Sequence, residues 1–368
     1  MILQQITLQN FRNIEIARLD FREGGHFFFG QNGQGKSNLL EGIGYITALR
    51  SFRTAENRLL VRDGNPEAAI GYALEHEVFG ETSVTLRIDA GGTRQVQWDG
   101  NKVERLADII GRFPAVVFAS GDIQFVRGSP GVRRRWIDMV LSATDPLYFQ
   151  ALQHYYRTMA ARNALLKRRA GVEEFSAFER EMAGPAAGLI EARRRGVGLL
   201  NEFFEVVYGR VSGGGEHAAL VYRASCGEKA GEIELVERWK GSRDRDSMLG
   251  VTQSGPHRDD FVLSLDGRSS ARYGSEGQQR SLVIALRFAE MEYFRKRTNL
   301  LPLVLLDDIV GELDRNRRER FWERVEAEAQ VFATGTERLR LPGKKWNFFR
   351  VDSGAFFTVE QEAVSPAD

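Results

Sequence analysis

The chain has 368 residues, 42% of them hydrophobic and 27% charged, which is the composition of an ordinary globular protein. No apolar run approaches the roughly 18 residues of a membrane span, and residues 1–13 lack the layout of a secretory signal. A single cysteine, Cys226, excludes an internal disulfide framework, so we expect a cytoplasmic protein without membrane contact. The net charge of +1 gives no argument for nucleic-acid binding, which must rest on where charges lie.

The first hundred residues read as strands around one glycine-rich loop. Alternating apolar residues predict strands within residues 2–20, and the run HFFF (26–29) predicts a buried strand directly before the loop. Residues 37–49 then have apolar side chains at helical spacing. Strand, loop and helix in this order are the context in which a phosphate-binding loop is credible. Residues 68–99 alternate again between glycine turns, which predicts a small antiparallel layer.

The middle of the chain is helical. Apolar residues step by three and four from Phe149 through Tyr156, and again after residue 174, which predicts a helical hairpin with arms of roughly 35 and 50 Å. Pro185 and three nearby glycines predict that the second helix is bent or divided. Strands and helices alternate from residue 259 to 336, and we expect a disordered tail at 364–368. We therefore predict a head formed by residues 1–125 and 213–368, with a helical domain inserted at 126–212.

The loop at residues 30–37 matches the pattern G-x-x-x-x-G-K-[ST]. Glycines let successive backbone N–H groups point at phosphate oxygens, helped by the N-terminus of the following helix. Lys36 would reach the β- and γ-phosphates of a nucleotide, and Ser37 would ligate Mg²⁺. The alternative is a chance glycine-rich turn, which the flanking strand and helix disfavour. The predicted nucleotide contacts in this segment are Gly30, Gln31, Asn32, Gly33, Gln34, Gly35, Lys36, Ser37 and Asn38.

The apolar run at 303–308 ends in two carboxylates and provides the second half of this site. Asp307 would hold Mg²⁺, directly or through water, and Asp308 is placed to polarise the attacking water, so the predicted catalytic residues are Lys36 and Asp308. The alternative is a buried strand that ends in a solvated acidic turn. The two halves are about 270 residues apart, which leaves room for a large insertion.

A third motif selects among the many classes of P-loop protein. Ser275, Gly277 and Gln278 open a predicted long helix about thirty residues before the acidic strand, and they resemble the signature motif of ATP-binding-cassette (ABC) ATPases. That resemblance implies a γ-phosphate contact with the nucleotide held by the opposite subunit. An ordinary capped helix is compatible with it, since Ser275 and Gln278 also fit a capping box. Residues 311–314 (GELD) resemble the loop along the dimer interface of that superfamily.

Six stretches together resemble the RecF family of bacterial DNA-repair ATPases. They run over nearly the whole chain, and the third and fourth are far more specific than the P-loop: residues 8–13 (LQNFRN), 30–41 (GQNGQGKSNLLE), 128–138 (GSPGVRRRWID), 254–260 (SGPHRDD), 275–286 (SEGQQRSLVIAL) and 305–314 (LLDDIVGELD). The resemblance implies an α/β fold: a P-loop ABC-type ATPase head, with a mixed sheet, flanking helices and a small antiparallel β layer, and an inserted helical hairpin domain.

The same resemblance implies a function in recombinational repair and replication restart. The expected protein binds ATP and Mg²⁺, forms a homodimer in the ATP state, binds double-stranded DNA at gap junctions, and acts with RecO and RecR to help load RecA. Rival classes are an SMC-like or nuclease-coupled P-loop ATPase and the ATPase subunit of a transporter. A nuclease domain would need more chain than follows residue 330, and a transporter subunit would carry a histidine switch, where this chain offers Thr334 or Thr336.

Departures and isolated residues leave several alternatives open. Gly121 stands where the family usually has proline, and Gly311 replaces a serine or alanine. With Asp308 in place of glutamate and no histidine switch, we expect slow hydrolysis. Arg12 either contacts the nucleotide or forms a strand-edge ion pair. Gln124 is a candidate for the residue that senses Mg²⁺, and the alternative is that it has no such role in this chain. Arg258 and Asp259 belong either to a functional turn or to a structural turn fixed by internal ion pairs.

Three basic clusters lie in the predicted helical region, where residues 131–212 contain 13 Lys and Arg against nine Asp and Glu. Any single cluster is better explained as a solvated helix face, but three in one region favour contacts with the phosphate backbone of DNA. Such binding would be sequence-neutral and sensitive to salt. The predicted contacts are Arg133, Arg134, Arg135, Lys167, Arg168, Arg169, Arg193, Arg194 and Arg195.

Overall fold

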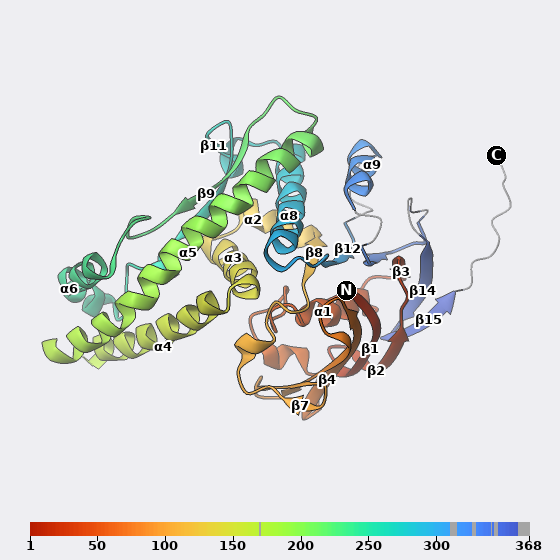
Figure 1. Cartoon of the computed structure of the whole chain (residues 1–368), viewed down its shortest axis with the longest axis horizontal. Coiled ribbons are helices and arrows are strands. Elements are labelled where there is room, and N and C mark those ends of the chain that lie inside the picture. The colour runs from red at the N-terminus through yellow and green to blue at the C-terminus, as the bar shows by residue number, and fades with distance from the viewer. Residues whose placement is uncertain (169–170, 310–314, 326–328, 340, 342–344, 360–368) are drawn as a thin grey trace. The chain divides into compact units, whose positions relative to one another are not determined.

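The chain divides into two compact units, shown in a computed structural model that describes residues 1–168, 171–309, 315–325, 329–339, 341 and 345–359 (Figure 1). Unit 1 combines Met1–Gly121 with Phe294–Asp368, and unit 2 is Asp122–Tyr293. The division falls close to the predicted start of the insertion at residue 126. Unit 2 continues beyond residue 212, the predicted end of the insertion, and includes residues 213–293 with the signature motif.

Two six-stranded sheets form the framework of unit 1. The antiparallel sheet has the order β2-β1-β4-β5-β6-β7, and its strands alternate buried and exposed residues because one face is covered. The other sheet has the order β15-β14-β3-β13-β12-β8 and is parallel except for β15. Their strands are β1 (Ile2–Phe11), β2 (Ile14–Asp20), β3 (Gly25–Phe29), β4 (Glu67–His76), β5 (Gly80–Asp89), β6 (Arg94–Trp98), β7 (Asn101–Lys102), β8 (Ala115–Ala119), β12 (Leu303–Asp307), β13 (Val331–Gly335), β14 (Trp346–Asp352) and β15 (Ala355–Val359).

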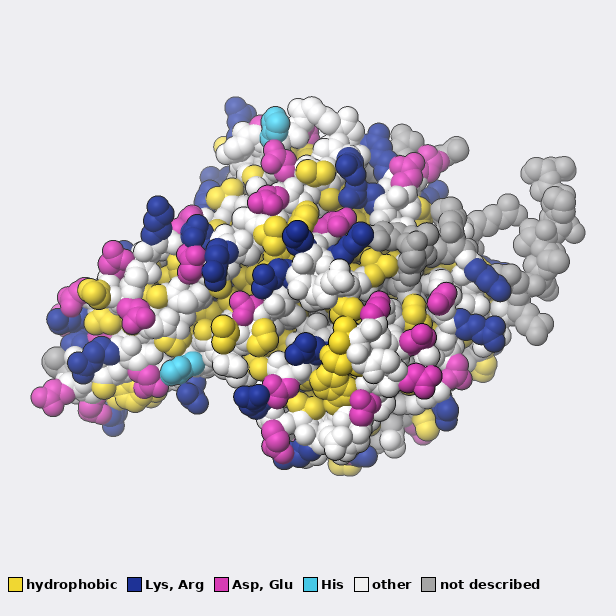
Figure 2. All heavy atoms as spheres, viewed as in Figure 1, with side chains coloured by type: hydrophobic (Ala, Val, Ile, Leu, Met, Phe, Trp, Pro, Cys, Tyr) yellow, Lys and Arg dark blue, Asp and Glu magenta, His cyan; other side chains and the backbone are white. Residues whose placement is uncertain are grey.

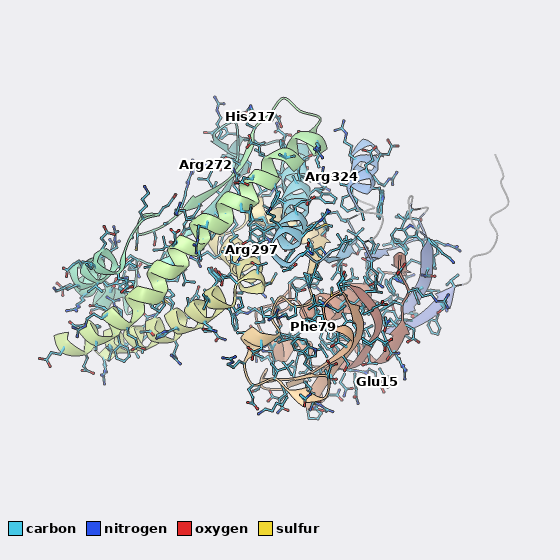
Figure 3. The ribbon with its side chains drawn as sticks, in the orientation of Figure 1. Glu15, Phe79, His217, Arg272, Arg297 and Arg324 are labelled. Carbon is cyan, nitrogen blue, oxygen red and sulfur yellow. The ribbon has the colours of Figure 1, made fainter. Side chains whose placement is uncertain are left out.

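The helices of unit 1 are few. Helix α1 (Lys36–Tyr45) follows β3, α9 (Arg315–Arg324) follows β12, and short 3-10 turns lie at η1 (Asn57–Leu60) and η2 (Leu106–Asp108). The predicted strand–loop–helix order at residues 26–49 is confirmed. Glu15 on the edge strand β2 points outward and pairs with Arg62 at 2.7 Å (Figure 3).

A helical hairpin forms the long part of unit 2, as predicted. Helices α4 (Pro146–Arg168) and α5 (Val172–Ser212) run side by side (Figure 1). Of the two predicted alternatives for α5, division is wrong, because the helix continues through Pro185 for 41 residues, and the bend stays a prediction. A Cβ at Gly196 would lie 2.4 Å from the Leu141 side chain, so this glycine permits close packing of α5 against α3 (Pro130–Thr144).

The rest of unit 2 consists of a small sheet, further helices and 3-10 turns. The three-stranded antiparallel sheet has the order β11-β10-β9. Helix α8 crosses the division between the units near its C-terminal end. No helix in the described ranges is long and apolar enough to cross a membrane. The elements are η3 (Ser120–Ile123), α2 (Gln124–Arg127), α3 (Pro130–Thr144), β9 (Ala218–Arg223), α6 (Glu232–Leu249), η4 (Pro256–Arg258), β10 (Asp260–Leu265), β11 (Arg268–Ser269), α7 (Ser270–Tyr273) and α8 (Glu276–Thr298).

Candidate nucleotide-binding site

The loop between β3 and α1 has the backbone that its glycines predict. Gly30, Gly33 and Gly35 have φ values of 155°, 81° and 114°, which side-chain-bearing residues rarely adopt. A Cβ on Gly30 would lie 2.3 Å from the carbonyl oxygen of Val351. Two constraints therefore require glycine at Gly30: its φ and the neighbouring strand β14.

The ammonium of Lys36 lies within the curve of this loop. The side chain is almost completely buried, and its Nζ donates to the carbonyl oxygens of Gly30 at 2.6 Å and Gln31 at 2.9 Å. These bonds use two of the three N–H donors of an ammonium group. The loop therefore fixes a positive charge at the start of α1.

Ser37 joins the loop to the acidic strand, and its predicted role as a ligand of Mg²⁺ stays a prediction. Its Oγ donates to Asp307 Oδ1 at 2.6 Å across 270 residues of chain. The two meet because β12 is separated from β3 only by β13 in the parallel sheet. Burial, with a smaller contribution from neighbouring Asp308, raises the pKa of the Asp307 carboxyl. A hydroxyl and a carboxylate that is costly to ionise fit Mg²⁺, which prefers oxygen ligands and would relieve that cost.

Thr334 connects the two carboxylates at the end of β12. The side chain is buried, and its Oγ1 accepts from the Asp308 N–H at 2.9 Å and lies 3.2 Å from Asp307 Oδ1. Asp308 has a φ of 57°, a left-handed conformation that costs more for a residue with a side chain than for glycine. These contacts give Thr334 a role in orienting the carboxylates, and its predicted contact with a nucleotide stays a prediction.

A cleft of about 660 Å³ opens beside the P-loop within unit 1. Arg12 and Arg53 line it, and both bind the buried carboxylate of Glu41, at 2.7 Å and 3.3 Å. Arg12 thus forms an ion pair, and its predicted contact with a nucleotide stays a prediction because the residue also lines the cleft. Sequence reasoning missed Glu41 and Arg53. The available signal for Glu41 is an acid on an otherwise apolar helix segment.

The signature motif in unit 2 forms a capping box. The Ser275 N–H donates to Gln278 Oε1 at 2.6 Å, and the Gln278 N–H donates to Ser275 Oγ at 3.3 Å. Gln278 also donates its side-chain amide to Glu216. Ser275 itself is exposed, and Gly277 lies in the first turn of α8. The capping reading is confirmed, and it remains compatible with a phosphate contact. The GELD segment lies outside the described residues.

Two arginines predicted to contact DNA are internal, so those predictions are wrong. Arg193 is fully buried and binds Asp138 at 2.8 Å and Asp259 at 2.9 Å. Arg133 is nearly buried and pairs with Asp260 at 2.8 Å. Of the others, Arg134 and Arg135 are partly exposed, Lys167, Arg168, Arg194 and Arg195 are exposed, and Arg169 lies outside the described part of the chain.

The SGPHRDD motif is a turn fixed from within. Asp259 is fully buried and accepts hydrogen bonds from Arg193, from Tyr222 Oη at 2.7 Å and from the Ser225 N–H at 2.8 Å. Arg258 reaches the carbonyl of Thr252 at 3.4 Å. The contacts support the structural alternative for this turn. Gln124 begins α2 in unit 2, and its role in sensing Mg²⁺ stays a prediction.

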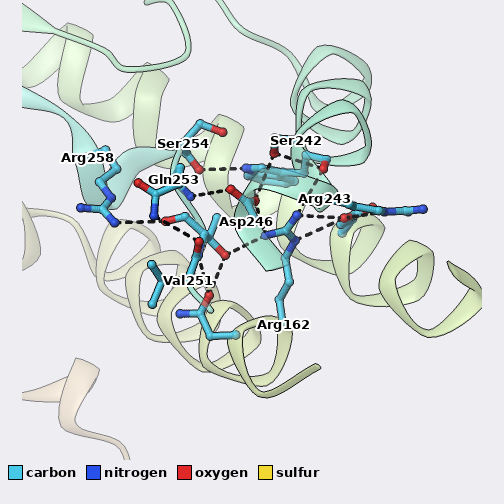
Figure 4. Close-up of polar contacts among 12 residues, drawn as sticks. Arg162, Ser242, Arg243, Asp246, Val251, Gln253, Ser254 and Arg258 are labelled. Carbon is cyan, nitrogen blue, oxygen red and sulfur yellow. Dashed lines mark hydrogen bonds and ion pairs between the residues drawn. The ribbon is translucent and has the colours of Figure 1, made fainter. Parts of the chain in front are cut away.

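A second buried arginine, which sequence reasoning missed, holds α6 against the hairpin (Figure 4). Arg162 of α4 is fully buried and binds Glu179 of α5 at 3.1 Å and Asp246 of α6 at 2.8 Å. It also donates to Thr252 Oγ1 at 2.9 Å and to the Trp239 carbonyl at 3.2 Å. One guanidinium thus joins three helices and the loop after α6.

A family model and known proteins match this chain over most of its length. A model described as the RecF/RecN/SMC N terminal domain matches residues 2–341. The DNA replication and repair protein RecF of Leptospira interrogans is 34% identical over 344 residues, which cover 92% of each chain. The protein of the same name from Moorella thermoacetica is 34% identical over 346 residues, covering 93% of this chain and 92% of its own.

Two solved structures also resemble this chain over nearly its whole length. A recombination mediator protein RecF with ATP, of the RecFOR pathway, superposes with a TM-score of 0.90 at 30% identity, over 97% of both chains. An Smc head bound to the C-winged helix domain of ScpA has a TM-score of 0.55 at 16% identity over 98% of both chains, which is a likeness of fold alone.

The fold and the contacts around Lys36, Ser37 and Asp307 define a class, the P-loop ATPase heads of the RecF/RecN/SMC type, and the predicted fold class is confirmed. Within that class, the two relatives that are 34% identical over about nine-tenths of the chain are both RecF proteins. The chain belongs to the RecF family.

Proposed function

We propose that this chain is an ATP-dependent DNA-binding protein of recombinational repair and replication restart, acting in the cytoplasm. In this proposal two copies close around ATP and grip duplex DNA next to single-strand gaps, and with RecO and RecR they help load RecA. The carrying observation is the 2.6 Å bond between Ser37 and Asp307, which assembles both halves of a nucleotide site in a chain whose relatives are named DNA replication and repair protein RecF.

Each residue of the site has a separate task in this proposal. The backbone N–H groups of residues 33–37 bind phosphate oxygens, and the remaining donor of Lys36 binds the terminal phosphates. Ser37 and Asp307 would hold Mg²⁺, which neutralises phosphate charge when bound. Asp308 accepts the proton of the attacking water. The cleft lined by Arg12 and Arg53 would receive the base and ribose.

The second subunit would complete the site. Ser275 is exposed at the start of α8, so its hydroxyl is available to the γ-phosphate held by a partner copy. Hydrolysis then opens the dimer, so the rate of ATP hydrolysis sets how long the dimer stays bound to DNA. The exposed cations proposed to contact the DNA backbone are Lys167, Arg168, Arg194 and Arg195.

Sedimentation with and without ATP tests this proposal. Lys36→Met should abolish ATP binding and dimerisation, because it removes the charge that holds the phosphates. Ser275→Arg should bind ATP as the wild type does but remain monomeric and inactive in hydrolysis. A Ser275→Arg protein that still dimerises with ATP would refute the shared site. Filter binding of duplex DNA with and without ATP tests whether closure of the dimer increases the affinity for DNA.

A further inference from the structure

The P-loop is attached to a hairpin at the other end of the chain. Strands β14 and β15 are joined by a two-residue turn, because Asp352 pairs directly with Ala355. Its residues Ser353 and Gly354 have φ values of 49° and 83°, as a tight turn of this kind requires.

Gln34 in the P-loop accepts three hydrogen bonds from this turn, the longest of them from Ser353 Oγ to Gln34 Oε1 at 3.4 Å. The Ser353 N–H donates to Gln34 Oε1 at 2.6 Å, and the Gly354 N–H donates to the Gln34 carbonyl oxygen at 2.8 Å. Both the side-chain oxygen and the backbone oxygen of Gln34 are therefore bound to the turn. The loop position is therefore tied to the position of the hairpin turn.

Asn13 joins the turn and the loop on a second side. Its Nδ2 donates to the Gly33 carbonyl at 3.3 Å, and its Oδ1 accepts from Asn38 at 2.7 Å. A Cβ on Gly354 would lie 2.8 Å from the Asn13 carbonyl oxygen, and a Cβ on Gly35 would lie 2.9 Å from Asn13 Oδ1. The three segments touch closely enough that displacing the hairpin turn must displace the loop.

We propose that the Ser353–Gly354 turn positions the P-loop for its nucleotide, with Gln34 as the positioning residue that receives it. Gln34 then acts through the loop backbone instead of contacting the nucleotide. This inference rests on the proposed function, in that the loop is taken to bind ATP. A loop held in its bound shape loses less conformational freedom on binding, so the hairpin raises nucleotide affinity.

The β6–β7 hairpin provides a matched control. Asp99 and Gly100 form its two-residue turn with φ values of 47° and 76°, and a Cβ on Gly100 would have nothing within 4 Å. Gly354→Ala and Gly100→Ala therefore introduce the same backbone strain, but only Gly354→Ala pushes against Asn13 and the loop. A third variant, Gln34→Met, keeps the side-chain length and removes the strong acceptor.

Calorimetric titration of the full chain with ATPγS and Mg²⁺ measures the effect. Gly354→Ala and Gln34→Met should each weaken binding about tenfold, which corresponds to the loss of roughly one hydrogen-bonded restraint, and Gly100→Ala should not change it. In nucleotide-free protein, the amides of residues 33–37 should exchange with solvent deuterium faster in Gly354→Ala than in Gly100→Ala.

Two results would overturn the inference. Equal affinity of Gly354→Ala, Gly100→Ala and wild type would show that the turn does not influence the loop. Weak binding by Gln34→Met alone, with unchanged exchange in Gly354→Ala, would show that Gln34 contacts the nucleotide directly. If wild type does not bind ATPγS at all, the proposed function fails, while the exchange comparison still decides whether the hairpin orders the loop.

Discussion

The polar groups of the candidate nucleotide site in unit 1 lie at the end of a parallel sheet, whereas two arginines of unit 2, Arg162 and Arg193, are fully buried and paired with carboxylates. In unit 1, Lys36 keeps one N–H donor beyond those bound by the loop, and burial raises the pKa of the Asp307 carboxyl. In unit 2, Arg162 and Arg193 are fully buried, and each guanidinium binds two carboxylates and further oxygens. A charged group is poised for a ligand when the protein leaves its bonding capacity unfilled, and it is structural when the protein fills it.

The distribution of charge over the surface agrees with this distinction. In Figure 2, basic and acidic side chains are interspersed on the face shown, without one continuous basic field. Arg194 pairs with Glu191 at 2.8 Å and Arg195 lies 3.6 Å from the same carboxylate, in exposed positions where such pairs contribute little. These exposed pairs can therefore be exchanged for phosphates at low cost, whereas the buried pairs cannot.

The largest effect should come from the buried pairs. Arg193→Ala leaves Asp138 and Asp259 in the interior without their cation, and we expect a loss of about 3–5 kcal/mol in the free energy of unfolding. The neighbouring exposed variant Arg194→Ala should change stability by no more than about 0.5 kcal/mol. Urea denaturation of both variants measures this. Equal stability of the two variants would contradict the distinction between buried and exposed ion pairs.

A smaller loss should follow from the hydroxyl that orients the acidic pair. Thr334→Val has nearly the same shape but leaves the Asp308 N–H without its acceptor, which should cost about 1–3 kcal/mol. Thr334→Ser restores the hydroxyl and should recover most of the loss. The comparison uses urea denaturation without nucleotide, and a Val variant as stable as the Ser variant would contradict the assigned role.

The third prediction concerns the pH dependence of stability. Because the pKa of Asp307 is raised in the folded chain, its contribution is fully present below the unfolded value of about 3.9 and is lost as pH rises through the folded value. Asp307→Asn avoids this loss, so it should be more stable than wild type by about 1 kcal/mol at pH 7. That advantage should shrink toward pH 4.

Two further measurements sharpen this test. Added Mg²⁺ should stabilise wild type and not Asp307→Asn, since the variant lacks the carboxylate. Asp63→Asn, at an exposed acid of the same unit, should show neither effect. An Asp307→Asn protein that is less stable than wild type at pH 7 would show that the ionised carboxylate is favoured by its surroundings.

The smallest effect on stability should come from the exposed cluster, where the effect is on DNA. The double variant Arg194→Ala, Arg195→Ala should leave the unfolding free energy within about 0.5 kcal/mol of wild type. The slope of log K against log salt for duplex DNA with ATP should become shallower by about 2, one unit for each lost phosphate contact. Arg105→Ala, an exposed arginine in unit 1, should keep the wild-type slope, and an unchanged slope in the double variant would remove these residues from the interface.

The sequence predicted unit 1 best where its signals are local. Residues 26–49 contain the strand, loop and helix in one stretch, and residues 303–308 contain an apolar strand with its terminal acids. The β14–β15 hairpin was missed, although residues 346–359 are two strand-like runs around Ser353 and Gly354. The bonds of that turn to Gln34 were beyond prediction, because backbone N–H groups more than 300 residues away leave no side-chain pattern.

In unit 2 the helices were predictable, but the environment of their charges was read wrongly. Arg193 stands four residues from Leu189 and four from Val197, on the same apolar stripe, and this spacing was the available sign of burial. Similarly, the predicted stripe used Tyr156, which is 38% exposed, whereas Tyr155 is fully buried. Counting charges per segment cannot reveal burial when the acidic partners come from distant segments.

Helix α6 was not predicted for a related reason. Within it, Leu235, Trp239 and Asp246 are the residues that the structure buries, so the segment has little apolar periodicity. Its attachment depends on Asp246 meeting Arg162, a pairing across 84 residues. Such a helix acquires its place from tertiary contacts that local propensity does not encode.

The position of β3 between β13 and β14 has a consequence for biosynthesis. When β3 and its loop leave the ribosome, both neighbouring strands are still some 300 residues from being made. Long-range parallel pairing of this kind is slow, and the waiting strand Gly25–Phe29 is strongly apolar. The intervening unit, Asp122–Tyr293, is finished first, so the nascent chain can complete one compact unit while unit 1, with its exposed apolar strand, is still incomplete.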